Sequence, residues 1–300
     1  MKITTPLIAA LFLIPGITLY SQTLTVDDIL ADGAEMVKIK SGFRFTEGPA
    51  VHPDGRVFFT DQPNNKIYIW DESDEITEFE VEGERANGMW ITKDGKLITC
   101  SDLHNRLLKI DMEGNKTILA EEYKGKHLNG PNDVWVNPEG YIYFSDSYYQ
   151  RPWWEEGHTQ LQDQRAVYCV KDNGKLIRVA EGFQMPNGLI GTPDGKYLYV
   201  ADINAKETWR YDIESNGKLS NKTFFAKEGS DGMTIDNLGN VYFTTGPVVL
   251  IIDPDGNKVG EIPVPENPAN VVFGGKDRDI LFITARTSVY RIDTKVRGAY

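Results

Sequence analysis

Residues 132–146 read NDVWVNPEGYIYFSD, and this short stretch carries the pattern that decides the fold of the whole chain. An Asn-Asp pair opens it, an apolar run follows, Pro-Glu-Gly turns the chain, and a second apolar run ends on Asp146. Asn and Asp are poor strand formers and good turn formers, so the pair could simply start a β-hairpin. Whether these side chains also have a chemical role depends on how often the pattern returns.

The same pattern returns in five other segments. Each begins with Glu, Asn or Asp, continues as an apolar strand, and usually reaches a Gly-containing turn before a second strand. The other copies are EGPAVHPDGRVFFTD (47–61), NGMWITKDGKLITCSD (87–102), NGLIGTPDGKYLYVAD (187–202), DGMTIDNLGNVYFTT (231–245) and NVVFGGKDRDILFIT (270–284). Their first residues, with that of the opening copy, lie 40, 45, 55, 44 and 39 positions apart, and a third strand usually follows. A repeat of this length and composition is typical of a β-propeller blade.

Six copies predict an all-β, six-bladed propeller that forms a single domain over residues 22–300. The sixth copy leaves too little chain after Asp293 for a full outer strand. The segment GAEMVKIKSGF (33–43) has no other partner, so we expect it to complete the last blade and close the ring. Closure of the ring also protects strand edges that would otherwise invite aggregation. A short helix is expected at Val26–Ala31.

Composition and charge exclude some classes of function. The chain has 300 residues, of which 40% are hydrophobic and 25% charged, as in a globular protein. Its net charge of −12 argues against a nucleic-acid partner, because phosphate binding needs a basic face. Cys100 and Cys169 do not occupy corresponding positions in the repeats. We expect both to be small buried hydrophobes rather than a disulfide or metal ligands.

The first 21 residues, MKITTPLIAALFLIPGITLYS, are predicted to be a signal peptide. Lys2 gives a short positive start, and Leu7–Tyr20 form an apolar core that is too short to span a bilayer comfortably. An uncleaved N-terminal anchor is the alternative. With either interpretation the folded part is exported, to the periplasm or outside the cell. No later apolar stretch is long enough for a membrane span.

The repeat also predicts where a site would lie. The first strand of each blade lines the central channel, and if all six run the same way, their first residues ring one mouth. These ring residues are Glu47, Asn87, Asn132, Asn187, Asp231 and Asn270. Two carboxylates and several amides in a small cavity are costly unless a cation compensates. Oxygen donors favour one divalent cation, Ca²⁺ first, with Mg²⁺, Mn²⁺ or Zn²⁺ as alternatives, although no paired His or Cys argues for zinc. The alternative is that these residues only start strands and cap hairpins.

The 55-residue spacing marks one long loop, SYYQRPWWEEGHTQLQDQ (147–164), on the same face as the ring. Tyr148, Trp153 and Trp154 could wall the ring and contact substrate, because exposed aromatic clusters usually mark contact sites. Alternatively, they pack the loop onto its blade. His104 and Arg286 fall near loops of this face, either as substrate contacts or as structural hydrogen-bonding groups.

At these residues the sequence resembles the family of gluconolactonase, regucalcin (senescence marker protein) and luciferin-regenerating enzyme, over about residues 40–295. The motifs are FTEGP with Glu47, GPNDV with Asn132, PNGL with Asn187 and SDGM with Asp231. The loop motif YYQRPWW resembles bacterial gluconolactonase-type members. The resemblance implies a six-bladed propeller with one divalent metal held by Glu47, Asn187 and Asp231. It further implies Asn132 as an additional ligand or substrate contact, and Asp231 as general base.

One departure from the family pattern concerns substrate recognition. Some animal members have a substrate-binding Arg two residues before the Asn that corresponds to Asn132, and here that position is Gly130. Substrate preference therefore cannot be copied from those members. Lys126, His127 and Asn129 are the candidates for the same space.

Together these expectations describe metal-assisted hydrolysis of a sugar lactone. The metal would polarise the carbonyl, and Asp231, or a water that it orients, would deliver the nucleophile. Asn87 and Asn132 would orient ring hydroxyls or the carbonyl. Asp133, next along the strand, should point the other way and brace neighbouring backbone. No Gly-x-Ser-x-Gly elbow is present, which disfavours a covalent acyl-enzyme.

Three other functions stay open at this stage. The first is a hydrolase of organophosphates or aryl esters at the same site. The second is a non-enzymatic, metal-stabilised propeller that binds a sugar or a protein partner. The third is a lyase or isomerase of sugar acids, because a fold does not determine its chemistry.

Overall fold

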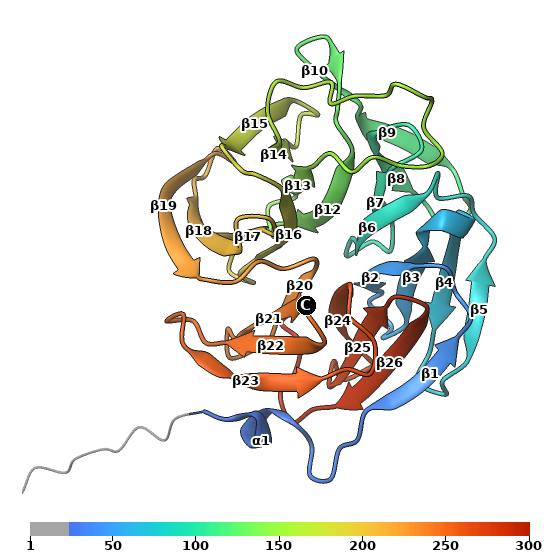
Figure 1. Cartoon of the computed structure of the whole chain (residues 1–300), viewed down its shortest axis with the longest axis vertical. Coiled ribbons are helices and arrows are strands. Elements are labelled where there is room, and N and C mark those ends of the chain that lie inside the picture. The colour runs from blue at the N-terminus through green and yellow to red at the C-terminus, as the bar shows by residue number, and fades with distance from the viewer. Residues whose placement is uncertain (1–23) are drawn as a thin grey trace, which may run out of the picture.

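The computed structural model describes residues 24–300, and its strands form a ring of six four-stranded sheets (Figure 1). The prediction of a six-bladed β-propeller is therefore confirmed. The predicted signal peptide lies outside the described residues. Within residues 24–300, no helix combines the length and apolar character needed to cross a membrane.

Each of the first five blades uses four consecutive long strands, ordered from the channel outward. Blades one and two contain β2 (Thr46–Val51), β3 (Val57–Asp61), β4 (Lys66–Trp70), β5 (Ile76–Phe79), β6 (Ala86–Ile91), β7 (Leu97–Ser101), β8 (Arg106–Ile110) and β9 (Lys116–Ala120). Blades three and four contain β12 (Pro131–Val136), β13 (Ile142–Asp146), β14 (Ala166–Val170), β15 (Leu176–Glu181), β16 (Pro186–Gly191), β17 (Tyr197–Asp202), β18 (Glu207–Ile213) and β19 (Leu219–Ala226). Blade five contains β20 (Met233–Ile235), β21 (Val241–Thr245), β22 (Val248–Ile252) and β23 (Lys258–Pro263).

The last blade closes the ring with a strand from the start of the chain. Its sheet contains β24 (Asn270–Gly274), β25 (Ile280–Ala285), β26 (Ser288–Asp293) and then β1 (Val37–Ser41). Val37 pairs with Arg291 and Ser41 with Ser288, so β1 lies antiparallel to β26, blue beside red in Figure 1. The expected closure is thus confirmed. The expected short helix is α1 (Val26–Ile29), and its Ile29 is fully buried.

The hydrophobic core lies between neighbouring blades. The middle strands are buried along their whole length, as in β3, β7 and β14, because blades cover both of their faces. Outer strands such as β1 are mostly exposed. Cys100 and Cys169 lie in β7 and β14, where both are free thiols with no exposed surface, so their prediction as buried hydrophobes is confirmed.

A glycine follows the ring residue in four blades, and it lets the innermost strands approach one another. A methyl group added at Gly48 would lie 1.8 Å from the carbonyl oxygen of Asn87, and one at Gly88 would lie 2.5 Å from that of Asn132. Gly188 faces the Asp231 carbonyl in the same way, and Gly232 faces the Asn270 side chain. In blades one to four the pairing of the first two strands shifts register beside the ring residue, as a β-bulge does when it re-aims a side chain.

Because of this packing, Gly88 should contribute to stability through the space it leaves for the next blade and not through its backbone φ. Gly88→Ala should lower the free energy of unfolding by about 2–3 kcal/mol, because the added methyl meets backbone that cannot yield. Chemical denaturation measures this. Gly125→Ala is the control: its methyl meets nothing within 4 Å, and its left-handed φ alone should cost about 1 kcal/mol. Equal losses in the two variants would contradict the packing argument.

Candidate functional site

The six ring residues meet at one mouth of the channel. The side-chain nitrogen of Asn270 donates to Glu47 Oε2 at 3.2 Å, although the two residues are 223 positions apart. Asn187 Nδ2 donates to Asp231 Oδ1 at 2.7 Å between blades four and five. Asn87 and Asn132 are also buried, and their backbone packs against the neighbouring glycines. The structure thus brings together the residues that the repeats aligned.

Glu47 is a buried carboxylate with little to compensate its charge. Its Oε2 accepts the Gly48 N–H at 2.6 Å in addition to the Asn270 amide. Burial raises the pKa of Glu47 well above its usual value, and the nearby negative charge of Asp231 raises it further. A cation between these two carboxylates would offset both the burial of the Glu47 charge and its repulsion by Asp231.

Asp231 lies just before β20 on a firmly held segment. Gly232 N donates to Thr244 Oγ1 at 2.9 Å, and Ser230 Oγ donates to the Gly232 carbonyl at 2.6 Å. Burial raises the pKa of Asp231 to about 6, against the opposing effects of the Asn187 hydrogen bond and the charges of Arg151 and Arg286. A carboxyl with a pKa in this range can accept a proton near neutral pH and release it again.

Asn187 provides the test of whether the site fits a metal. Its amide nitrogen donates to Asp231 and, at 2.9 Å, to the hydroxyl of Tyr149. Its Oδ1 is buried and finds no hydrogen-bond partner among residues 24–300. An orphaned buried oxygen is costly and calls for a ligand. Beside two carboxylates, this oxygen fits a hard cation.

The donor set also limits which metal fits. No three His, Cys, Asp or Glu side chains of the described residues are grouped so that they could hold a metal. A cation at the ring would therefore rest on the carboxylates of Glu47 and Asp231 together with amide oxygens. The Asn132 and Asn87 side chains make no hydrogen bond within the described part of the chain. Carboxylate and amide oxygens suit Ca²⁺ or Mg²⁺ rather than zinc, which prefers His and Cys.

Asp133, the second half of the opening Asn-Asp pair, braces backbone as predicted. Its Oδ2 accepts the N–H of Leu189 in blade four at 3.1 Å, and its Oδ1 accepts that of Val134 at 3.0 Å. It occupies the position at which four other blades have glycine. Burial raises the pKa of this carboxyl to about 7, against the two hydrogen bonds.

The long loop 147–164 crosses from blade three to blade two, drawn in yellow-green in Figure 1. Trp154 and Trp153 donate their indole N–H groups to the Asp102 carbonyl oxygen at 2.7 and 3.3 Å. Tyr148 donates its hydroxyl to the His158 carbonyl at 2.9 Å. The two indole groups therefore fix the loop to blade two, and contact of the aromatic residues with a substrate stays a prediction.

Several other residues that were predicted to contact substrate have different surroundings in the structure. Asn129 has no exposed surface; its Nδ2 donates to the Gln164 carbonyl, and its Oδ1 accepts the N–H groups of Leu161 and Gln162. The loop thus occupies the Asn129 oxygen and one bond of its amide nitrogen, and a contact of Asn129 with substrate stays a prediction. Lys126 and His127 form the exposed strand β11 (Lys126–His127), paired with β10 (Glu122–Tyr123). His104 is exposed. It makes no side-chain hydrogen bond within the described chain.

Two residues of the loop were missed by the sequence reasoning. Tyr149 receives the hydrogen bond from Asn187, and Arg151 forms an ion pair with the buried carboxylate of Asp102. The guanidinium lies 5.3 Å from the centre of the Tyr149 ring. The only sequence signal was an Arg placed among aromatic residues in YYQRPWW.

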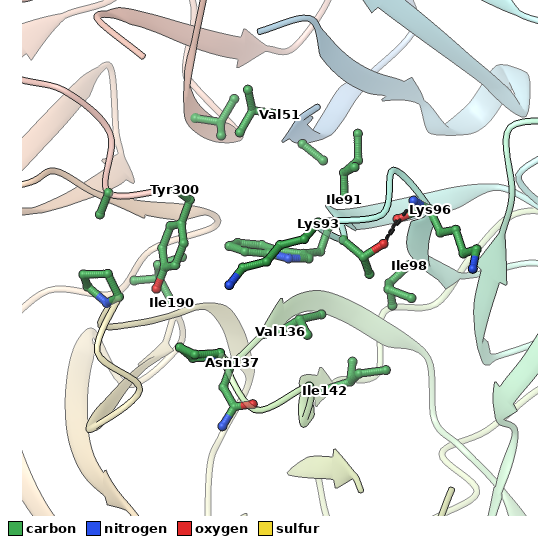
Figure 2. A pocket seen from close by; sticks show the side chains of 18 of the residues that line it. Val51, Ile91, Lys93, Lys96, Ile98, Val136, Asn137, Ile142, Ile190 and Tyr300 are labelled. Atoms are coloured by element: carbon green, nitrogen blue, oxygen red, sulfur yellow. Dashed lines mark hydrogen bonds between the residues drawn. The ribbon is translucent and has the colours of Figure 1, made fainter. Parts of the chain in front are cut away.

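The opposite mouth of the channel is chemically different. A cavity of about 840 Å³ lies there, lined by the far ends of the inner strands at Val51, Ile91 and Val136 and by Tyr300 (Figure 2). None of the six ring residues lines it. Tyr300 donates its hydroxyl to the Gly191 carbonyl at 2.6 Å. This mouth offers an apolar cavity and no cluster of converging carboxylates and amides.

Comparisons with known proteins agree with this geometry. Gluconolactonase of Zymomonas mobilis is 30% identical over 312 residues, which cover 94% of this chain and 87% of that protein. A gluconolactonase structure from Xanthomonas campestris is 25% identical with a TM-score of 0.83 and covers 91% of this chain and 94% of its own. Regucalcin from Agrobacterium tumefaciens shares the fold at 20% identity and a TM-score of 0.72, covering 87% of this chain and 94% of its own. Residues 45–287 match the family model described as "SMP-30/Gluconolactonase/LRE-like region". The chain therefore belongs to the SMP-30/Gluconolactonase/LRE-like family.

Proposed function

We propose that the protein is a metal-dependent lactonase that hydrolyses sugar lactones of the gluconolactone type. The observation that carries this proposal is the buried Asp231 carboxyl, with its pKa raised to about 6, beside Glu47 and the orphaned oxygen of Asn187. The similarity to two gluconolactonases supports the class of substrate. Hydrolysis needs a base near neutral pH and a group that stabilises negative charge on the carbonyl oxygen, and the ring can provide both.

Four ring residues would hold the metal: Glu47, Asn132, Asn187 and Asp231. We favour Ca²⁺ because every donor is an oxygen, and because the structural neighbour regucalcin is described as calcium-binding. When bound, such a cation polarises the lactone carbonyl and stabilises the charge that develops on its oxygen.

The side chains of the ring divide the remaining work. Asp231 would take the proton from the attacking water. Its carboxylate would also be one of the metal ligands, which keeps this base near the lactone carbonyl. The Asn187 amide holds Asp231 Oδ1 at 2.7 Å, which orients the carboxylate. The Asn87 amide and the amide nitrogen of Asn132 would bind ring hydroxyls. The loop with Tyr148, Trp153 and Trp154 would cover the substrate and limit water at the mouth.

We also propose that the protein is exported, so that it meets lactones outside the cytoplasm. The support is the sequence of residues 1–21 alone. Mass spectrometry of the protein from its native cell fractions tests this: a mature N-terminus near Gln22 in an exported fraction supports it. A full-length chain in the cytosolic fraction would contradict it.

Replacement of the base tests the reaction. Asp231→Asn should lower kcat/KM for glucono-δ-lactone by at least about 1000-fold, because proton transfer and a donor charge are lost together. A pH-indicator assay of acid release measures the rate, with phenyl acetate and a phosphotriester as competing substrate classes. Asp194→Asn, in an exposed turn at the opposite face, is the matched control and should keep full activity. Near-normal turnover by Asp231→Asn, or faster turnover of the phosphotriester, would refute the proposal.

Metal binding should depend on pH. Because burial raises the folded-state pKa of Asp231 from 3.8 to about 6, the metal-free protein loses stability as pH rises through this range, and a cation that binds the ionised form restores it. Saturating Ca²⁺ should therefore raise Tm by roughly 5 °C or more at about pH 8, and by clearly less at about pH 5.

Thermal unfolding with and without a chelator measures this shift. Glu47→Gln removes one donor charge and should abolish most of the shift at the higher pH. Glu72→Gln, an exposed carboxyl near the opposite mouth, should leave the shift intact. A Ca²⁺-induced shift that is equal at both pH values would show that the ring carboxylates do not bind the ion.

A further inference from the structure

Three aspartates occupy the same register position at the end of the second strand of blades one, three and four, namely Asp61, Asp146 and Asp202. In blade two Ser101 holds this position, and Asp102 is the next residue. In each of the three aspartates the carboxylate accepts two consecutive backbone N–H groups from the segment that leads into the ring residue. The donors are Arg44 and Phe45 for Asp61, Asn129 and Gly130 for Asp146, and Gln184 and Met185 for Asp202. The repeat therefore assigns this aspartate a structural role.

Asp102, one position further along in blade two, does not have this role. The N–H groups equivalent to those that the three aspartates cap belong to Glu84 and Arg85, and both residues have a left-handed backbone, with φ of 54° and 55°. The N–H of Arg85 donates to the Asn65 side chain, at 2.5 Å. The carboxylate of Asp102 thus has no part in capping this backbone.

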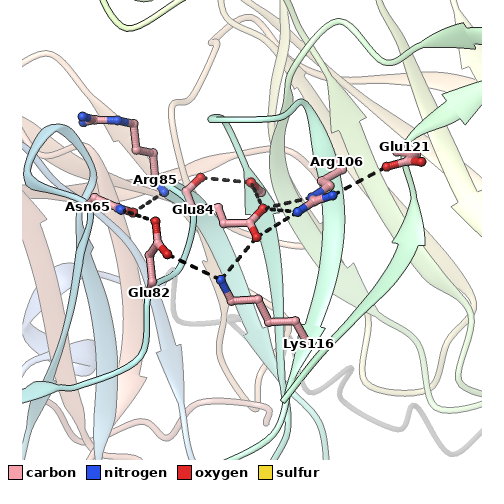
Figure 3. Close-up of polar contacts among 8 residues, drawn as sticks. Asn65, Glu82, Glu84, Arg85, Arg106, Lys116 and Glu121 are labelled. Atoms are coloured by element: carbon pink, nitrogen blue, oxygen red, sulfur yellow. Dashed lines mark hydrogen bonds and ion pairs between the residues drawn. The ribbon is translucent and has the colours of Figure 1, made fainter. Parts of the chain in front are cut away.

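Other interactions hold the segment that leads into Asn87 in blade two. Glu84 accepts hydrogen bonds from Arg106 at 2.8 and 2.9 Å and from Lys116 at 3.2 Å (Figure 3). Ser101 Oγ also donates to the Glu84 carbonyl at 2.9 Å. Blade two therefore has a separate polar network for its structure.

The Asp102 carboxylate holds Arg151. Asp102 Oδ2 accepts the Gln62 amide at 2.7 Å and pairs with Arg151, and the side chains of the pair are only 3% and 19% exposed. The guanidinium lies over the rings of Tyr149 and Trp153, at 5.3 and 5.7 Å from their centres. Such contacts leave a long side chain little freedom, so Arg151 is preorganised.

The held guanidinium adjoins the ring of donors. The Tyr149 ring beneath it carries the hydroxyl that accepts the Asn187 amide, and the same amide donates to Asp231. No hydrogen bond within the described residues occupies the two Nη groups of Arg151. A guanidinium presents a fork of donors that binds two adjacent oxygens at once. Adjacent hydroxyls on a lactone ring offer this arrangement.

We propose that Arg151 is a specificity-determining residue that binds the hydroxyl oxygens of a polyhydroxylated lactone, and that Asp102 is its positioning residue. This inference rests on the proposed lactonase function. A lactone without hydroxyls leaves the Nη groups of Arg151 without a partner in the complex, and sites built in this way discriminate strongly against analogues that lack the group.

The test compares two lactones with the same six-membered ring, glucono-δ-lactone and δ-valerolactone, which has no hydroxyls. Arg151→Met should lower kcat/KM for glucono-δ-lactone by about 30- to 100-fold and for δ-valerolactone by less than about threefold. Arg151→Lys keeps the charge but not the fork, and should recover only part of the loss. Asp102→Asn should lower the ratio of the two kcat/KM values about tenfold through a rise in KM for the hydroxylated lactone.

Asp146→Asn is the control, because it alters a fully buried carboxylate of the neighbouring blade that accepts backbone N–H groups. It should lower Tm and affect both lactones to the same degree. A selectivity ratio unchanged in Arg151→Met, in a wild-type protein that does open lactones, would overturn this inference alone. Failure of the wild-type protein to open either lactone would overturn the proposed function and this inference with it.

Discussion

The constraint on which the rest of the structure depends is the close approach of the innermost strands around the channel. Gly48, Gly88, Gly188 and Gly232 each leave room for the backbone or side chain of the next blade. With a larger residue there, the ring could not close to its present width. At Gly188 the same close approach brings the preceding polar side chain within hydrogen-bonding distance of the next blade, as in Asn187–Asp231. At this junction packing and site assembly thus have one cause.

That assembly has an electrostatic cost. Glu47, Asp133 and Asp231 are buried near one axis, and the charge of Asp231 raises the pKa of each of the other two. Hydrogen bonds from Leu189 and Val134 offset part of the cost at Asp133. At Glu47 only one backbone N–H and one amide oppose burial. The burial of charge is therefore least compensated at the ring residue Glu47, where a cation would bind.

Most of the fold could be predicted from the sequence because the same strand pattern occurs six times, so several segments support each prediction. The blade boundaries, the ring residues and the closing strand all follow from the alignment of segments such as 47–61 with 132–146. The alternation of side chains along a strand was sufficient to predict the bracing role of Asp133. The roles of Asn129 and Arg151 could not be predicted in this way. Both depend on the loop 147–164, which has no counterpart in the other blades, and on contacts with blade two that no spacing reveals.

The departures from the repeat are more informative about function than the repeat itself. Where glycine is the rule, blade three has Asp133, which joins two blades by hydrogen bonds instead of close packing. Where three blades have an aspartate that caps backbone, blade two has Ser101, and a network around Glu84 holds the corresponding segment. The next residue, Asp102, holds an arginine from the long loop. Because the loop and the Asp102 carboxylate converge on the mouth with the metal-type donors, the proposed specificity and the proposed catalysis belong to the same end of the channel.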